Sequence, residues 1–197
     1  MSHYFIDDKS LEHNIVSKDV FINDKQFSFL TDNGVFSKKG LDFGTRSLLE
    51  SLPNDINGDA LDFGCGYGPI GIYLKKTYNC NVDMIDINER SIDLAKQNAK
   101  LNNASVNIFY SDIYSNVNKK YDYIVTNPPI RVGKNILYKI LFEAKEHLKA
   151  NGKIYLVINK DQGAKSLMKD LENDYEVELI NKNKGFFIIS AENRLTK

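Results

Sequence analysis

The chain has 197 residues, 42% of them hydrophobic, which is enough to build one sizeable core within the usual size of a single domain. Its 26 basic residues balance 26 acidic ones, so net charge gives no general argument for a nucleic-acid partner. No apolar run approaches the ~20 residues that span a bilayer, and no secretory leader is apparent, so we expect a cytoplasmic protein without membrane segments. Two cysteines and three scattered histidines, in no metal-ligand spacing, argue against a disulfide scaffold or a metal site.

Residues 1–58 are predicted to form an N-terminal extension. Two short apolar runs within residues 20–30 flank the turn-forming segment 23–26, which predicts a small hairpin. Residues 45–52 have the pattern of a helix. Because no linker rich in Gly, Ser or Pro follows, we expect this extension to pack on a catalytic domain formed by residues 59–197.

From residue 59 onward, short apolar runs alternate with longer amphipathic ones, as in crossover units around a mostly parallel sheet. The predicted strands cover residues 60–63, 82–86, 106–110, 123–126, 154–158, 176–180 and 186–191. The predicted helices cover residues 69–77, 89–101, 135–149 and 162–171. The last two strands are joined by the short segment 181–185. We therefore expect an α/β fold with a doubly wound, seven-stranded, mostly parallel sheet and an antiparallel C-terminal hairpin strand.

A glycine-rich loop follows the first strand of this sheet, with glycines at positions 64, 66 and 68, and a helix comes next. Glycine lets the backbone approach a ligand closely, and this order of elements is typical of nucleotide sites. A dinucleotide site would have glycine where Pro69 stands. Asp62 adds a carboxylate beside the loop, which repels a pyrophosphate and attracts a sulfonium or ammonium group. The loop therefore predicts a cationic cofactor and disfavours a nicotinamide dehydrogenase.

Polar side chains also end the next three strands. Asp86 lies where a carboxylate can accept hydrogen bonds from both ribose hydroxyls, and Asp112 can accept from an adenine amino group. Each acid alone is typical of a loop or a helix cap. Because the carboxyl ends of successive strands meet at one crevice, we expect these acids and Asn127 to form one site with the glycine loop.

The segment Asn127-Pro128-Pro129-Ile130 follows the fourth strand. The side-chain oxygen of Asn127 and the carbonyl of Pro128 can both accept hydrogen bonds from one planar NH2 group. The two prolines stiffen the turn and keep its carbonyls out of a helix. Asn-Pro alone is also a common turn. After the glycine loop and the two acids, however, the segment predicts a site that orients an amino group for alkylation.

These motifs resemble, in the same order, those of class I S-adenosylmethionine-dependent methyltransferases, from about residue 34 to the C-terminus. Residues 34–37 and 41–45, with the loop extended to Gly71, are similar to small-domain enzymes that methylate guanine N2 in small-subunit ribosomal RNA, in particular to short, single-domain bacterial members. The resemblance implies a Rossmann-like methyltransferase fold, S-adenosyl-L-methionine as cofactor, and 16S ribosomal RNA or the small ribosomal subunit as partner.

The resemblance also implies roles for individual residues. The cofactor-binding residues that it implies are Asp62, Gly64, Cys65, Gly66, Gly68, Asp86, Ile87, Asp112, Ile113 and Asn127, with Phe36 and Thr45 close by. The catalytic residues that it implies are Asn127, Pro128, Pro129 and Ile130. Related enzymes often have an aromatic residue at the position of Ile130, where it stacks on the target base with ~1–3 kcal/mol. An aliphatic side chain packs on a base more weakly, so this position does not specify which base is methylated.

Three basic residues are candidates for contacts with RNA phosphates: Arg131 and Lys134, which follow the Asn-Pro-Pro turn, and Lys184. Each is also typical of a solvated surface.

Two other functions fit the same motifs. A glutamine side-chain amide is also a planar NH2 group, so methylation of glutamine N5 in a protein is one alternative. The other is a non-catalytic module that senses the cofactor or binds RNA, although such a module has no need of an amine-orienting asparagine.

Overall fold

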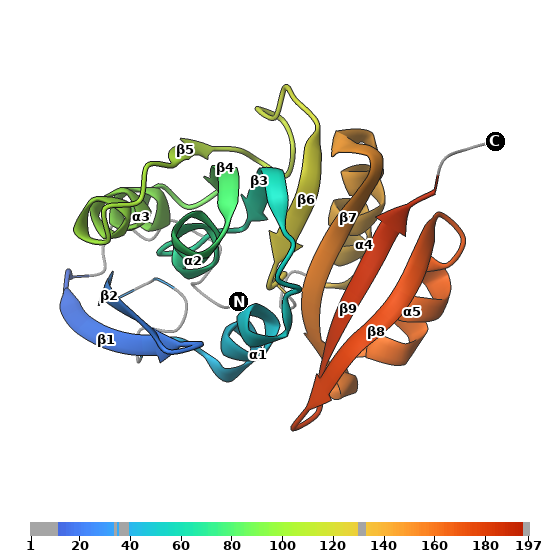
Figure 1. Ribbon diagram of the computed structural model, residues 1–197, viewed down its shortest axis with the longest axis horizontal. Coiled ribbons are helices and arrows are strands. Elements are labelled where there is room, and N and C mark those ends of the chain that lie inside the picture. Colours follow the sequence, from blue (N-terminus) through green and yellow to red (C-terminus); the bar gives the residue numbers. More distant parts are fainter. Residues whose placement is uncertain (1–11, 34, 36–39, 130–132, 195–197) are drawn as a thin grey trace.

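The computed structural model describes residues 12–33, 35, 40–129 and 133–194 (Figure 1). Its helices are α1 (Phe43–Ser51), α2 (Pro69–Thr77), α3 (Glu89–Leu101), α4 (Lys134–Glu143) and α5 (Ala164–Leu171), with the short 3-10 helices η2 (Ala144–His147) and η3 (Lys160–Gln162). Its strands are β1 (Val16–Ile22), β2 (Lys25–Thr31), β3 (Asn57–Phe63), β4 (Asn79–Asp86), β5 (Asn107–Tyr110), β6 (Tyr121–Thr126), β7 (Leu148–Asn159), β8 (Tyr175–Asn183) and β9 (Phe186–Asn193).

In the described part of the chain, one sheet has seven strands in the order β5-β4-β3-β6-β7-β9-β8, and β1 and β2 form a separate hairpin. The strands from β5 to β7 pair in parallel, and β9 is antiparallel to both β7 and β8. The predicted doubly wound sheet with an antiparallel C-terminal hairpin is thus confirmed. The strand order reverses between β3 and β6, and ligands of open α/β sheets bind beside such a reversal.

Helices cover both faces of the sheet, as Figure 1 shows, and each face has its own hydrophobic core. The alternation of side chains along β7 illustrates the division, since successive residues of a strand point to opposite faces. Ile154, Leu156 and Ile158 belong to the core shared with α4 and α5. Tyr155 and Val157 belong to the core shared with α1, α2 and α3. β7 is therefore buried on both faces, which explains why residues 154–158 form a continuous apolar run in the sequence.

The β1–β2 hairpin is attached to α3 by two asparagine side chains. Asn98 accepts a hydrogen bond from the Leu30 N–H at 2.7 Å and donates to the Leu30 carbonyl at 2.9 Å. Asn102, one helical turn later, pairs in the same way with the backbone of Ser28. One turn of helix and two residues of strand advance by similar lengths, so the two amides act as a partner strand for β2. Asn98 also donates to the Tyr67 carbonyl in the glycine loop, at 2.8 Å.

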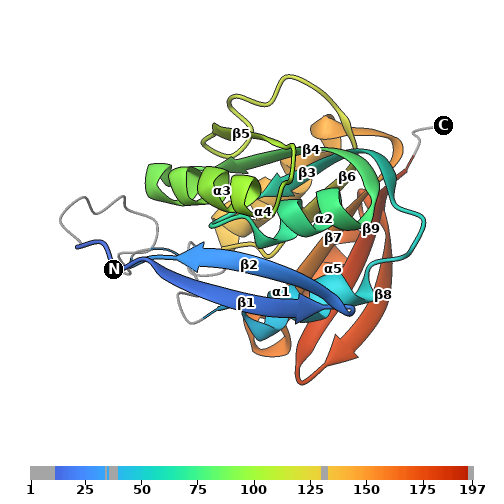
Figure 2. The same cartoon turned by 60° about the vertical axis from the view of Figure 1, so that its left-hand side comes forward.

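The hairpin also shares a hydrophobic core with the rest of the chain. Ile22, Phe27 and Phe29 are buried in the same cluster as Tyr67 and Tyr73. Figure 2 shows the hairpin lying alongside α2 and α3. The division of the chain at residue 58 stays a prediction.

Several element boundaries differ from the prediction, and three of the differences have a clear physical reason. The helix expected over residues 135–149 ends in η2, and β7 begins at Leu148, so pairing with β6 overrides a helical apolar spacing. The helix expected over residues 162–171 is interrupted at Gly163, which has a left-handed backbone (φ +84°). In the β1–β2 hairpin the turn is shorter than residues 23–26, because Asn23 and Asp24 both adopt positive φ and pairing resumes at once.

Candidate active site at the carboxyl ends of the strands

The structure brings the predicted strand-end residues together. In Figure 1, β6 and β7 run toward the side of the sheet where α1 lies. The neighbouring ends are tied by hydrogen bonds: the Gly66 N–H donates to Asp86 Oδ2 at 2.8 Å, and the Ser111 N–H donates to the Asp86 carbonyl at 3.0 Å. The hydroxyl of Thr126, just before Asn127, donates to the Phe63 carbonyl at 2.8 Å. The glycine loop is therefore fixed to both neighbouring strands.

Two glycines of the loop border open space. Gly64 and Gly66 have φ values of +69° and +55°, and a Cβ atom on either would meet no atom within 4 Å. A ligand can therefore approach this backbone closely. Gly71 serves another purpose, because a Cβ atom there would lie 2.5 Å from Cγ of Met84. It allows α2 to pack tightly on β4.

Asp62 and Cys65 lie beneath the loop. Asp62 is fully buried; its Oδ2 accepts from the Gly71 N–H at 2.8 Å, and its Oδ1 has no hydrogen-bond partner among the described residues. Burial, followed by the charge of Asp86, raises the pKa of Asp62 to about 8. The ionised carboxylate envisaged from the sequence is therefore the minor form at pH 7 until a cation comes close. Burial also raises the pKa of the Cys65 thiol, so this residue offers the loop a backbone position and no thiolate.

Asp86 is oriented by backbone donors on both of its oxygens. Oδ2 accepts from Gly66, and Oδ1 accepts from the Asn88 N–H at 2.9 Å. Burial raises the pKa of Asp86, although these hydrogen bonds oppose the shift. Each carboxylate oxygen can accept a second hydrogen bond, so the side chain retains acceptor capacity for hydroxyl groups. The next residue, Ile87, is 42% exposed and offers an apolar surface beside it.

The turn after β5 carries Asp112, whose side chain is exposed. Its N–H donates to the hydroxyl of Ser115, at 3.2 Å. The buried hydroxyl of Ser111 donates to the Ile113 carbonyl at 2.9 Å, and Ile113 has an unusual positive φ of 52°. Ser111 thus shapes the turn that presents Asp112 and Ile113. This role of Ser111 could not be predicted from the sequence, because serine is common in turns.

Asn127 is held by the start of α1. Its Nδ2 donates to Thr45 Oγ1 at 3.0 Å and to Asp42 Oδ1 at 3.3 Å. Among the described residues, no hydrogen bond uses Asn127 Oδ1, which leaves that acceptor for a substrate. Pro128 is buried and Pro129 is half-buried beside it. The predicted residues Phe36, Ile130 and Arg131 lie outside the described residues.

The sequence did not indicate that Asp42 belongs to the group of residues around Asn127. Asp42 is the N-cap of α1, since its Oδ1 also accepts from the Thr45 N–H at 3.0 Å. An aspartate just before a helix is the expected capping residue, so the sequence could have placed it at the helix start. Its contact with Asn127, 85 residues away, depends on the tertiary fold.

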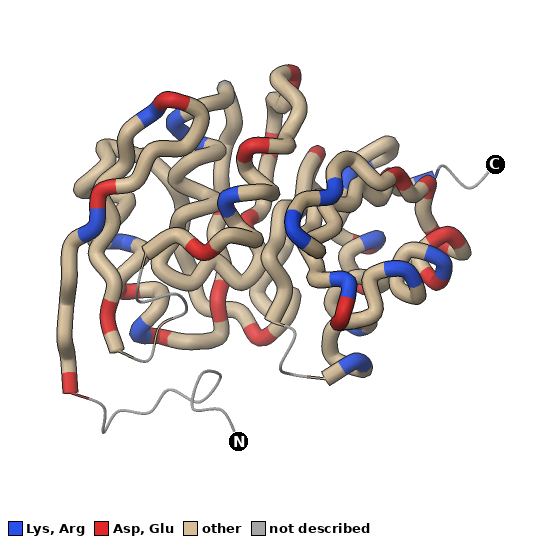
Figure 3. Tube along the Cα trace, turned by 90° about the horizontal axis from the view of Figure 1, so that it is seen from below, with Lys and Arg blue, Asp and Glu red and all other residues tan. Residues whose placement is uncertain are grey.

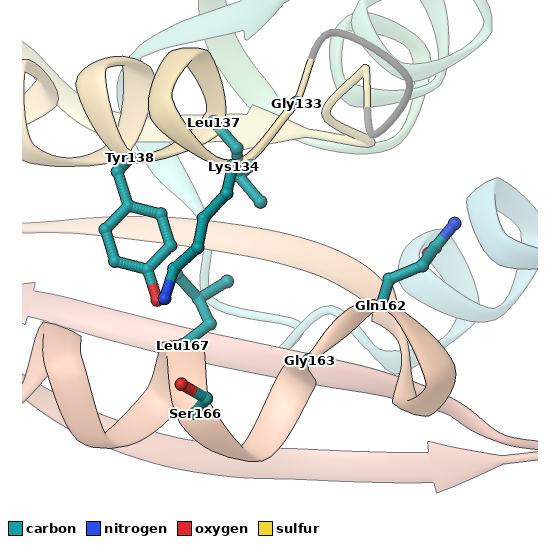
Figure 4. A pocket seen from close by; sticks show the side chains of 8 residues that line it. All are labelled: Gly133, Lys134, Leu137, Tyr138, Gln162, Gly163, Ser166 and Leu167. Carbon is teal, nitrogen blue, oxygen red and sulfur yellow. The ribbon is translucent and has the colours of Figure 1, made fainter.

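The two described basic candidates lie in different surroundings. The Lys184 ammonium is 5.1 Å from the ring centroid of Phe43, the first residue of α1, so it lies next to the site. The Lys134 ammonium is 4.7 Å from the ring centroid of Tyr138. Figure 4 shows Lys134 and Tyr138 lining a pocket of about 200 Å³ between α4 and α5. None of the described residues predicted to bind the cofactor lines this pocket, so it is separate from the strand-end site.

Comparisons with known proteins identify the family. The model of the family described as methyltransferase small domain matches residues 26–190. An uncharacterized protein of Bacillus subtilis, YbxB, is 42% identical over 196 residues, which cover 96% of this chain and 98% of the relative. Ribosomal RNA small subunit methyltransferase C of Psychromonas ingrahamii is 38% identical over 71% of this chain, and that of Haemophilus influenzae is 36% identical over 73%. The chain spans 41% and 45% of the lengths of these two relatives.

Solved structures show the same fold. The T. thermophilus 16S rRNA N2 G1207 methyltransferase (RsmC), in complex with AdoMet and guanosine, superposes with a TM-score of 0.82 at 24% identity, covering 91% of this chain and 51% of that one. The ribosomal protein L11 methylase of Lactobacillus delbrueckii superposes with a TM-score of 0.68 at 21% identity, covering 77% and 79%. In the described part of the chain, no helix is long and apolar enough to cross a membrane. The chain belongs to the methyltransferase small domain family and has the fold of the class I S-adenosylmethionine-dependent methyltransferases.

Proposed function

We propose that this protein transfers a methyl group from S-adenosyl-L-methionine to an exocyclic amino nitrogen, namely guanine N2 of small-subunit (16S) ribosomal RNA in the cytoplasm. The observation that carries the proposal is the orientation of Asn127. Its amide nitrogen is turned toward Asp42 and Thr45, and its Oδ1 is left as an acceptor beside the glycine loop. An amino group with two protons is the complement of that oxygen and the Pro128 carbonyl.

The residues around the loop fit the cofactor. The open space above Gly64 and Gly66 admits a ligand against the backbone, and the lone pairs of Asp86 suit ribose hydroxyls. The unpartnered Oδ1 of Asp62 leaves a buried acceptor under the loop, and a cation nearby would lower the pKa of that carboxyl. When bound, S-adenosyl-L-methionine supplies an electrophilic methyl group. Asp112 and Ile113 are proposed to contact the adenine, and Ile87 to pack beside the ribose.

The protein contributes positioning and electrostatics. An aromatic amine is a poor nucleophile because its lone pair is delocalised into the ring. Hydrogen bonds from its two protons to Asn127 Oδ1 and the Pro128 carbonyl would hold the nitrogen in place for attack. The same two acceptors would stabilise the positive charge that develops as the nitrogen becomes pyramidal. The stiff Asn-Pro-Pro turn keeps both acceptors in position without further ordering.

The fold alone does not choose between RNA and protein as methyl acceptor, because a structural neighbour named as a ribosomal protein methylase shares it. RNA is favoured by the relatives above 30% identity that are named ribosomal RNA small subunit methyltransferase C. Lys184 beside α1 and Lys134 on α4 are proposed to contact phosphates of the RNA or of the small ribosomal subunit. The alternative acceptor, a glutamine amide, would use the same Asn127 chemistry.

The proposal is tested by transfer of a labelled methyl group from S-adenosyl-L-methionine. The acceptors are naked small-subunit RNA, assembled small subunits and ribosomal protein, all prepared from cells that lack this protein. We expect label in RNA, recovered as N2-methylguanosine after digestion to nucleosides. Label in protein glutamine would establish the alternative, and binding of the cofactor without transfer to any acceptor would indicate a non-catalytic module.

A further inference from the structure

The side-chain amide of Asn127 can face only one way. An amide has a donor end and an acceptor end, and the two are distinguished by their partners. Here Nδ2 faces Thr45 Oγ1 at 3.0 Å and Asp42 Oδ1 at 3.3 Å. An ionised carboxylate only accepts hydrogen bonds, so the amide nitrogen, and not its oxygen, must face Asp42. The opposite orientation would set Oδ1 against that carboxylate.

The two partners of Asn127 are themselves fixed by the helix start. Thr45 is buried, with 3% of its surface exposed, and the Asp42 carboxylate is anchored by the Thr45 N–H at 3.0 Å. The Arg46 N–H donates to the Asp42 carbonyl at 3.0 Å and continues the first turn of α1. The geometry around Asn127 is therefore set by a capped helix, which is more rigid than a loop.

We infer that Asp42 and Thr45 are positioning residues that lock Asn127 with Oδ1 presented to the substrate amine, an inference that rests on the proposed function. Both protons of Nδ2 are used, so the amide cannot rotate without losing two hydrogen bonds. Without this lock, Asn127 could turn its own NH2 toward the substrate NH2, and the two donors would repel. The Asp42 charge also polarises the amide, which makes Oδ1 a stronger acceptor for a nitrogen that becomes positive.

Thr45 is the residue to change, because Asp42 also caps α1 and its removal would disturb the helix. Thr45→Val removes the hydroxyl but keeps the shape and the backbone N–H that Asp42 accepts. Thr45→Ser restores a hydroxyl. Ser47→Ala is the matched control, since Ser47 lies on the same helix and its buried hydroxyl has no hydrogen-bond partner in the described part of the chain. All four proteins are compared by thermal unfolding to show that they fold.

Two readouts separate this inference from the proposed function. The first is hydrogen exchange of the Asn127 side-chain amide by NMR, its signals identified by their loss in Asn127→Ala. We expect protection in the wild type, Thr45→Ser and Ser47→Ala, and faster exchange in Thr45→Val. The second is methyl transfer to small-subunit RNA. We expect kcat to fall about 10- to 100-fold in Thr45→Val, as for other residues that act through a neighbour, with KM for RNA and cofactor nearly unchanged. Thr45→Ser should recover most of the loss.

The outcomes are distinct. An Asn127 amide that exchanges equally in the wild type and Thr45→Val would overturn the inference, as would equal kcat values. A wild-type protein that methylates no RNA would overturn the proposed function, while the amide measurement would still decide whether Thr45 holds Asn127.

Discussion

At the scale of single residues, Asn127 and Asp86 should separate turnover from cofactor binding. Asn127→Ala removes an acceptor for the substrate amine while leaving the glycine loop untouched. We expect turnover to fall about 10²- to 10³-fold, as for loss of one preorganised charge-stabilising group, with the cofactor Kd nearly unchanged. Single-turnover methylation and calorimetric binding measure the two effects. Comparable losses in both would remove Asn127 from the role of amine acceptor.

Asp86→Ala should show the opposite pattern. The carboxylate is oriented by Gly66 and Asn88 and is proposed to accept from the ribose hydroxyls. Its loss should weaken cofactor binding by roughly 1.5–3 kcal/mol, the usual range for a hydrogen bond to a charged group. Calorimetric titration checks this prediction, and an unchanged Kd would exclude Asp86 from the cofactor site.

The buried carboxyl of Asp62 should make stability depend on pH. Burial raises its pKa from an ordinary 3.8 to about 8, so the folded protein keeps a proton that the unfolded chain loses above pH 4. The stability that the neutral carboxyl provides is therefore full below pH 4 and is lost as the pH rises toward 8. We expect the free energy of unfolding of the wild type to fall relative to Asp62→Asn, by up to about 1.4 kcal/mol per pH unit.

Denaturant titrations of the wild type and Asp62→Asn at pH 5, 6 and 7 give this difference directly. The asparagine keeps an acceptor for the Gly71 N–H and cannot ionise, so other titrating groups largely cancel. A difference that does not change with pH would contradict the burial of an ionisable Asp62.

At the scale of elements, Asn98 joins three parts of the fold. Asn98→Ala would remove the hydrogen bonds that its side chain makes with the N–H and carbonyl of Leu30 and with the carbonyl of Tyr67. We expect a loss of about 3 kcal/mol in stability and weaker cofactor binding, because the glycine loop loses an anchor. Asn102→Ala is the control: it breaks the pairing with Ser28 but touches no loop residue, so it should cost about 1 kcal/mol and leave cofactor affinity unchanged. Equal effects of the two variants on cofactor binding would contradict this account.

The elements also show what a sequence can and cannot specify. β7 was predictable because burial on both faces makes residues 154–158 a continuous apolar run, and the order of strand ends followed from parallel pairing. The boundary between α4 and β7 could not be predicted, because the apolar residues around Leu148 also fit a helix. Only the pairing with β6 shows that Leu148 begins a strand. Likewise, Asp42 is readable as a helix cap, but its hydrogen bond to Asn127 depends on how α1 docks against β6.

At the scale of the whole molecule, Lys134 and Lys184 lie on a surface of mixed charge. Seen from the carboxyl edge of the sheet, basic residues recur along α4, α5 and the β8–β9 hairpin, with acidic ones between them (Figure 3). Lys134→Ala with Lys184→Ala should weaken RNA binding and lower the slope of log K against log salt by about 0.7 to 0.9 for each lost phosphate contact. Lys100→Ala, at an exposed position of α3, is the control and should leave the slope unchanged. RNA-binding titrations between 50 and 200 mM salt measure this slope. An unaltered slope in the double variant would show that RNA phosphates do not contact Lys134 and Lys184.

The most direct test of the central claim is nucleoside analysis of small-subunit ribosomal RNA from cells that lack this protein, complemented with either the wild type or Asn127→Ala. We expect N2-methylguanosine at one position to be missing in the deleted cells, to return with the wild type and to stay missing with Asn127→Ala. An unchanged set of N2-methylguanosine residues in the deleted cells, or full restoration by Asn127→Ala, would contradict the proposed function.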